Sequence, residues 1–124
     1  MEKADAFDRC NLDELSLEAI RAHGGEGLIG FRRIAQPTSL RGQCNFIDVA
    51  ELPPGVSIGR HTHADDEEEF YLVLSGAGHM WRDGEDFPVK TGDLIRNRPG
   101  GSHSLVNTGE RPLRIFVFEV KVVP

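Results

Sequence analysis

The chain has 124 residues, a formal net charge of −6 and a sequence pI near 5.3. A chain of this length fits one compact domain with its own core, and its acidic balance, without a cluster of Lys and Arg among aromatic residues, argues against nucleic acid and anionic membrane surfaces as partners. No apolar run approaches the roughly 20 residues of a membrane span, and no secretory signal pattern follows Met1, so we expect a cytoplasmic protein.

The first predicted element is a short helix near the N-terminus. Asn11 is a suitable capping residue, and Glu14 follows it at the spacing of a capping box. Apolar side chains then recur at helical spacing, at Leu12, Leu15, Ala19 and Ile20. The pattern predicts a helix over residues 11–22, which ends at the glycines after His23. We assign residues 1–27 to an N-terminal segment with this helix and residues 28–124 to a single β-domain.

The rest of the chain reads as short strands separated by turns. Turn sequences such as Pro53-Pro54-Gly55 and Asp83-Gly84 punctuate runs of apolar and β-branched residues. Strands are expected at residues 28–34, 45–52, 70–74, 79–82, 94–97, 104–106 and 113–122. Many short strands with regular turns predict an all-β sandwich or barrel.

Two histidines stand two residues apart in a stretch that we expect to be extended. His61 and His63 would point to the same face of a strand, so that both rings could reach one ion. An acidic run follows at residues 65–69, and His103 lies in a second glycine-rich turn. Three imidazoles and one carboxylate suit Fe, Mn, Ni, Zn or Cu better than Ca or Mg, which prefer oxygen ligands.

The spacing of these residues resembles the two sequence motifs of the cupin family. The first motif, G-x5-HxH-x3–4-E-x6-G, is matched at its glycine and histidine positions by Gly55, His61, His63 and Gly76. The second, G-x5-PxG-x2-H-x3-N, is matched by Gly92, Gly100, His103 and Asn107, with Arg98 at the proline position. The resemblance covers residues 46–119 and implies a cupin double-stranded β-helix, the jelly-roll barrel.

The family pattern also indicates which carboxylate completes the site. Counting back from Gly76 gives Glu69, although one residue more than the pattern allows then separates it from His63. Because a turn absorbs an extra residue more easily than a continuous strand, Glu69 is preferred and Glu68 is the alternative. The resemblance thus implies one divalent transition metal ion, Fe, Mn, Zn or Ni, with the ligands His61, His63, Glu69 and His103.

Four protein ligands leave about two positions of a six-coordinate ion for other molecules. Small cupins use such sites for isomerase, lyase or dioxygenase chemistry, so the resemblance implies a metal-dependent enzyme that acts on a carboxylate, a hydroxy-keto acid or a sugar acid. Tyr71 has the same strand parity as Glu69 and is the candidate general acid or base. The alternative is a non-catalytic cupin that binds a sugar or a carboxylate.

Two further histidines, His23 and His79, do not occupy motif positions, and we expect structural roles for both. Small cupins commonly form homodimers. Strands at residues 28–34 and 113–122 would expose β edges, which soluble proteins avoid, so we expect two copies to pair there.

Overall fold

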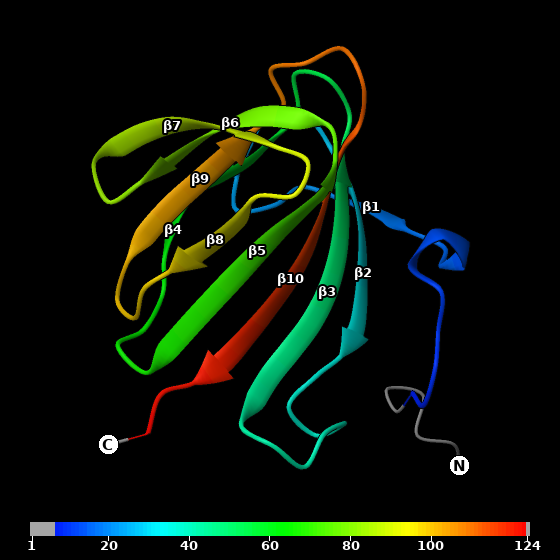
Figure 1. The fold of residues 1–124 in the computed structure, drawn as a ribbon, viewed down its shortest axis with the longest axis vertical. Helices are drawn as coiled ribbons and strands as arrows, with labels where there is room; N and C mark the ends of the chain where they lie inside the picture. The colour runs from blue at the N-terminus through cyan, green and yellow to red at the C-terminus, as the bar shows by residue number, and fades with distance from the viewer. Residues whose placement is uncertain (1–6, 124) are drawn as a thin grey trace.

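The structure is a computed structural model that describes residues 7–123, and in this part of the chain ten strands form two antiparallel sheets (Figure 1). The six-stranded sheet has the order β1 (Glu18–Ile20), β2 (Ile29–Ala35), β3 (Cys44–Leu52), β10 (Leu113–Lys121), β5 (Glu67–Ser75) and β8 (Leu94–Asn97). The four-stranded sheet has the order β4 (Ser57–Thr62), β9 (Ser102–Val106), β6 (Ala77–Arg82) and β7 (Glu85–Lys90). The predicted all-β barrel is confirmed.

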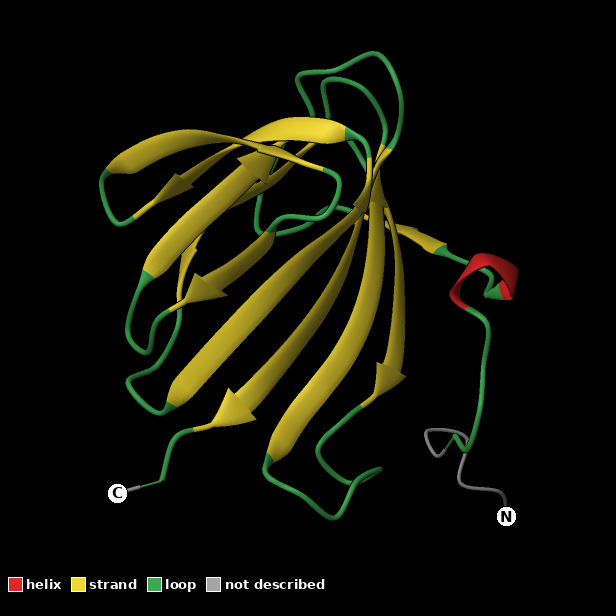
Figure 2. Ribbon diagram, viewed as in Figure 1, coloured by secondary structure: helices red, strands yellow, loops and turns green. Residues whose placement is uncertain are grey.

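The helix predicted over residues 11–22 is wrong in extent, as the single red turn in Figure 2 shows. Only the 3-10 turn η1 (Leu12–Glu14) forms, and Asn11 caps it by accepting a hydrogen bond from the backbone N–H of Asp13. The following residues enter strand β1, which pairs with β2. Local helix preference is weak in so short a segment, and pairing with a sheet outweighs it. No helix among residues 7–123 has the length and apolar character to cross a membrane.

The core lies between the two sheets, and alternation along β5 and β10 decides which side chains reach it. In β10, Ile115 and Val117 are buried against the core, whereas Phe116 and Phe118 face the other side of the sheet. The same parity buries Glu119, which lies beside Glu69 of β5. Carboxylates can therefore lie inside this barrel at one end of an otherwise apolar strand.

The sheet edges differ from the expectation. Strand β10 lies between β3 and β5 and presents no free edge, whereas β1 covers β2 only along residues 29–31. The strands at the ends of the larger sheet are the short β1 and β8. The expected free edge at β10 is therefore wrong, because this strand has neighbours on both sides, while the pairing of two copies stays a prediction.

Candidate metal centre

The two sheets together bring the four motif residues to one place. His61, near the end of β4, is paired directly with His103 of β9. His63 follows the end of β4, where its backbone N–H donates to the carbonyl of Gly101 at 3.0 Å. Glu69 reaches the same point from β5 in the larger sheet. The side chains thus converge across the barrel rather than along one strand.

The facing atoms of these side chains lie close together. One potential ligand atom from each of the four residues falls within 4.8 Å of the others. The Nε2 atoms of His63 and His103 are 2.9 Å apart, and Oε1 of Glu69 lies 3.2 Å from the former and 3.1 Å from the latter. His61 uses Nδ1 to donate to the carbonyl of Gly59 at 2.8 Å, which leaves its Nε2 lone pair available.

Glu119, which the sequence reasoning missed, holds His63 from behind. Its Oε1 lies 3.0 Å from Nδ1 of His63, and its Oε2 accepts a hydrogen bond from the amide of Asn45 at 2.9 Å. A carboxylate at Nδ1 keeps a proton on that nitrogen and turns Nε2 towards the cluster. One feature of the sequence could have indicated this residue. Glu119 is the single acidic residue in the apolar run that forms β10, at a position whose side chain points towards the core.

Glu69 and Glu68, the two candidates for the carboxylate ligand, have different surroundings. Glu69 is 5% exposed and faces the histidines. Glu68 has the opposite strand parity and pairs with the guanidinium of Arg96. The structure therefore places the carboxylate of Glu69, and not that of Glu68, among the imidazoles.

Burial and neighbouring charges change the acidity of three of these side chains. Burial alone would raise the pKa of Glu69, but hydrogen bonds and charges from His103 and His63 outweigh it and bring that pKa to about 2. The hydrogen bond to Glu119 and then that to Glu69 raise the pKa of His63 to about 10. Burial lowers the pKa of His61 to about 4. At neutral pH, without an ion, Glu69 is therefore ionised, His63 protonated and His61 neutral.

The chemistry of these donors fits a transition metal ion. Imidazole suits Zn, Cu, Fe and Ni, and a carboxylate also suits Mn. Two Nε2 atoms at 2.9 Å can share only one proton. In the absence of an ion, this shared proton provides the positive charge between the two rings. A bound metal ion would provide that charge in its place, so the arrangement suits a cation.

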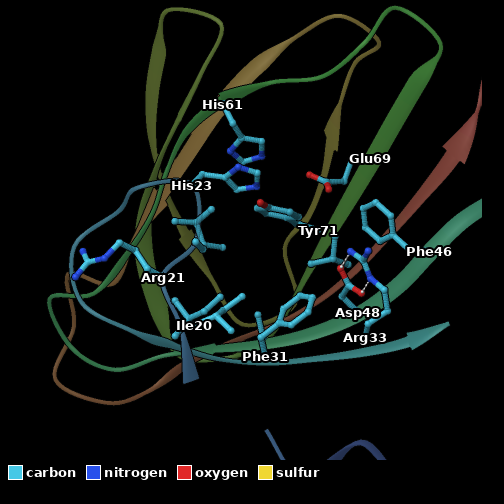
Figure 3. A pocket seen from close by; sticks show the side chains of 15 residues that line it. Ile20, Arg21, His23, Phe31, Arg33, Phe46, Asp48, His61, Glu69 and Tyr71 are labelled. Atoms are coloured by element: carbon cyan, nitrogen blue, oxygen red, sulfur yellow. Dashed lines mark hydrogen bonds and ion pairs between the residues drawn. The ribbon is translucent and has the colours of Figure 1, made fainter. Parts of the chain in front are cut away.

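A cavity of about 300 Å³ adjoins the cluster of four residues at His61 and Glu69 (Figure 3). Tyr71 is also part of its wall, with its ring between Glu69 and Phe31 in the view of Figure 3. The ring of Tyr71 meets that of His103 edge-on, with centroids 5.2 Å apart. Burial, followed by the charges of Glu69 and Asp48, raises the pKa of Tyr71 above its usual range, so the hydroxyl keeps its proton.

His23 also lines this cavity, although it was expected to be only structural. Its ring stacks on that of His61, with centroids 3.6 Å apart and planes 9° apart. The chain around it lies flush on β4, since a Cβ atom at Gly59 would fall 2.0 Å from the carbonyl oxygen of His23. His79, by contrast, does not line the cavity that adjoins the four residues. Sequence spacing to the motifs could not reveal a residue that enters from a separate loop.

Comparison with known proteins agrees with this architecture. The family profile described as a cupin domain matches residues 48–119. An oxalate-binding protein from Thermotoga maritima is 34% identical over 93 residues, which cover 75% of this chain and 76% of that protein. An uncharacterized protein from Methanocaldococcus jannaschii is 36% identical over 85 residues, which cover 68% of this chain and 67% of that protein.

Among solved structures, that of a predicted oxalate decarboxylase from Thermotoga maritima superimposes with a TM-score of 0.85. Its sequence is 30% identical, and the match covers 90% of this chain and 97% of that chain. The profile match and the two relatives from Thermotoga maritima agree with the barrel topology. The chain therefore belongs to the cupin family.

Proposed function

We propose that this protein is a metal-dependent enzyme that acts on a small oxygen-rich acid. Its metal centre would consist of His61, His63, Glu69 and His103 and would hold one divalent ion of Fe, Mn, Zn or Ni. The observation that carries the proposal is the convergence of one donor atom from each residue within 4.8 Å, beside a cavity of about 300 Å³. The Thermotoga relative is named for oxalate binding, which supports an acid as the ligand.

The bound ion would supply positive charge and Lewis acidity to the oxygen atoms of the acid. Glu69 contributes one negative charge to the centre, so a divalent ion keeps positive charge for an anionic ligand. Glu119 orients His63, and the neutral hydroxyl of Tyr71 can donate a hydrogen bond to an oxygen of the acid. We infer that Tyr71 orients the acid through this hydrogen bond, while keeping its own proton, in an isomerase, lyase or dioxygenase reaction.

A second candidate is non-catalytic binding of a carboxylate or sugar. Two observations favour it. The hydroxyl of Tyr71 holds its proton too firmly to act as a base near neutral pH. The Thermotoga relative that is 34% identical over 93 residues is named for binding and not for a reaction.

The test begins with protein purified without an affinity tag or chelator, whose metal content is measured by elemental analysis. Calorimetric titration with oxalate, citrate and a uronic acid then compares metal-loaded protein with protein stripped by a chelator. We expect these acids to bind only the loaded protein. Equal binding to stripped protein would contradict a metal-centred site. Monitoring the same acids by NMR for turnover separates the enzyme from the binding protein.

We also infer that two copies pair through the outer face of the larger sheet. This face carries apolar side chains on neighbouring strands, and Leu94 is 66% exposed. The rings of Phe70 and Phe118 stack there with centroids 4.8 Å apart, and Phe116 lies close by. A patch of this kind marks an interaction surface. Light scattering should give a dimer mass that Leu94→Asp reduces, whereas a wild-type mass of 13.7 kDa would contradict the pairing.

A further inference from the structure

The cavity beside the metal centre has two chemically different ends (Figure 3). His23, His61 and Glu69 lie at one end, and Ile20 and Phe31 lie at the opposite end. A ligand that fills the cavity must therefore match polar groups at one end and hydrocarbon at the other.

The apolar end comes from the N-terminal part of the barrel. Ile20 belongs to β1, and Ile29 and Phe31 belong to β2. All three residues precede position 48, where the match to the cupin domain begins. The matched segment thus supplies the candidate metal ligands, while this chain's own first strands shape the space that the rest of a ligand would occupy.

Two arginines lie in the wall of the cavity. Arg21 turns its guanidinium away from the cavity and donates to the carbonyl oxygen of Gly25 at 2.7 Å (Figure 3), and Arg33 is compensated by a carboxylate. The guanidinium of Arg33 donates from Nε and Nη2 to the two carboxylate oxygens of Asp48, at 2.8 and 2.9 Å. Asp48 is 4% exposed, and the guanidinium lies 4.3 Å from the centre of the Phe46 ring. Because this ion pair is neutral overall, the wall does not call for a second anionic group on the ligand.

The volume of the cavity exceeds that of a bare two-carbon diacid. A group the size of a water molecule occupies about 30 Å³, so a cavity of about 300 Å³ has room for about ten such groups. Oxalate has about six non-hydrogen atoms, and all its oxygens are polar. An oxalate bound at the metal end would leave the apolar end without a partner.

We propose that the ligand is a 2-oxo or 2-hydroxy acid with a single carboxylate and an apolar side chain. The carboxylate and the neighbouring oxygen would face the metal end, and the side chain would pack on Ile20, Ile29 and Phe31. This inference rests on the proposed function, because the acid head needs the metal centre. It goes beyond the proposed function because it names the apolar side chain of the ligand and the residues that would select it.

The first experiment uses metal-loaded wild-type protein and a series of acids with one constant head. Calorimetry measures the affinities for pyruvate, 2-oxobutanoate, 2-oxopentanoate and 4-methyl-2-oxopentanoate, with oxalate alongside. Each buried methylene adds about fourfold to affinity. We therefore expect affinity to rise by up to about fourfold with each added carbon and to exceed that for oxalate at the end of the series.

A pair of variants tests whether the named end of the cavity is responsible. Phe31→Ala removes a ring from the apolar end and should reduce the affinity for 4-methyl-2-oxopentanoate about tenfold more than that for pyruvate. Leu28→Ala is the matched control, since Leu28 is 50% exposed and does not line the cavity. It should leave the whole series as in the wild type.

The outcomes separate the two proposals. A series that rises in the wild type and flattens in Phe31→Ala supports the inference. Affinities that stay level or fall along the series, in protein that still binds pyruvate or oxalate only when metal is present, overturn the inference and leave the proposed function standing. If none of the acids binds the metal-loaded protein, the proposed function fails, and the inference falls with it.

Discussion

Replacing Glu119 by Gln tests the centre through a residue that is not one of the four proposed ligands. Glu119 is 3% exposed, and its two oxygens accept from His63 at 3.0 Å and from Asn45 at 2.9 Å. Glutamine has nearly the same shape but only one acceptor oxygen, so it cannot accept from both. Carboxylates behind a metal-bound imidazole contribute about 10- to 100-fold to metal affinity. We expect a loss of that size in Glu119→Gln.

The assay is a titration of metal against a competing chelator, and the matched control is Glu68→Gln. That control removes the same charge from a carboxylate that pairs with Arg96 on the other face of β5, and we expect its metal affinity to stay within about twofold of the wild type. Equal losses in the two variants would refute the role of Glu119. NMR titration of metal-free protein gives a second readout, because the pKa of His63 should fall when its strongest partner, Glu119, loses its charge.

Three further outcomes are expected. The double variant His61→Ala, His63→Ala should lose most bound metal while keeping the circular dichroism of a β-protein, and full metal occupancy would count against these ligands. Because the pKa of His63 is about 10, an ion must displace a proton from it, so metal affinity should rise by up to about tenfold per pH unit between about pH 6 and pH 8; a level profile would be inconsistent with this. Gly59→Ala should lower the free energy of unfolding by about 1–3 kcal/mol, since its Cβ would fall 2.0 Å from the carbonyl oxygen of His23. In the control variant Gly42→Ala, the added Cβ meets nothing within 4 Å, so thermal melts should show little change in stability.

Short-range patterns in the sequence predicted much of the fold and failed where partners are distant. The motif glycines and histidines indicated the barrel, and the structure gathers the four motif residues, although their binding of a metal stays a prediction. Apolar residues at helical spacing suggested a helix, but Ile20 instead faces the cavity from a strand. Strand β7 was missed because it is mostly polar and contains Pro88, which an edge strand tolerates.

The surroundings of the site were harder to predict than the four motif residues. The position of Glu119 beside Glu69 depends on the pairing of β10 with β5, and that register is not visible in either strand alone. His23 reaches His61 because the chain before β2 lies against β4. Both contacts join residues that are far apart in sequence, so no local spacing could have revealed them.

Strand β10 places neighbouring residues of one segment in two unrelated environments. Val117 lines the cavity and Glu119 contacts His63, whereas Phe116 and Phe118 lie on the outer face of the sheet. Since side chains alternate along a strand, deleting one residue near the start of β10 would turn the phenylalanines inward and Glu119 outward. In a library of single-codon deletions, this strand should therefore be among the least tolerant segments, whereas deletions in the exposed turn at residues 108–112 should survive more often.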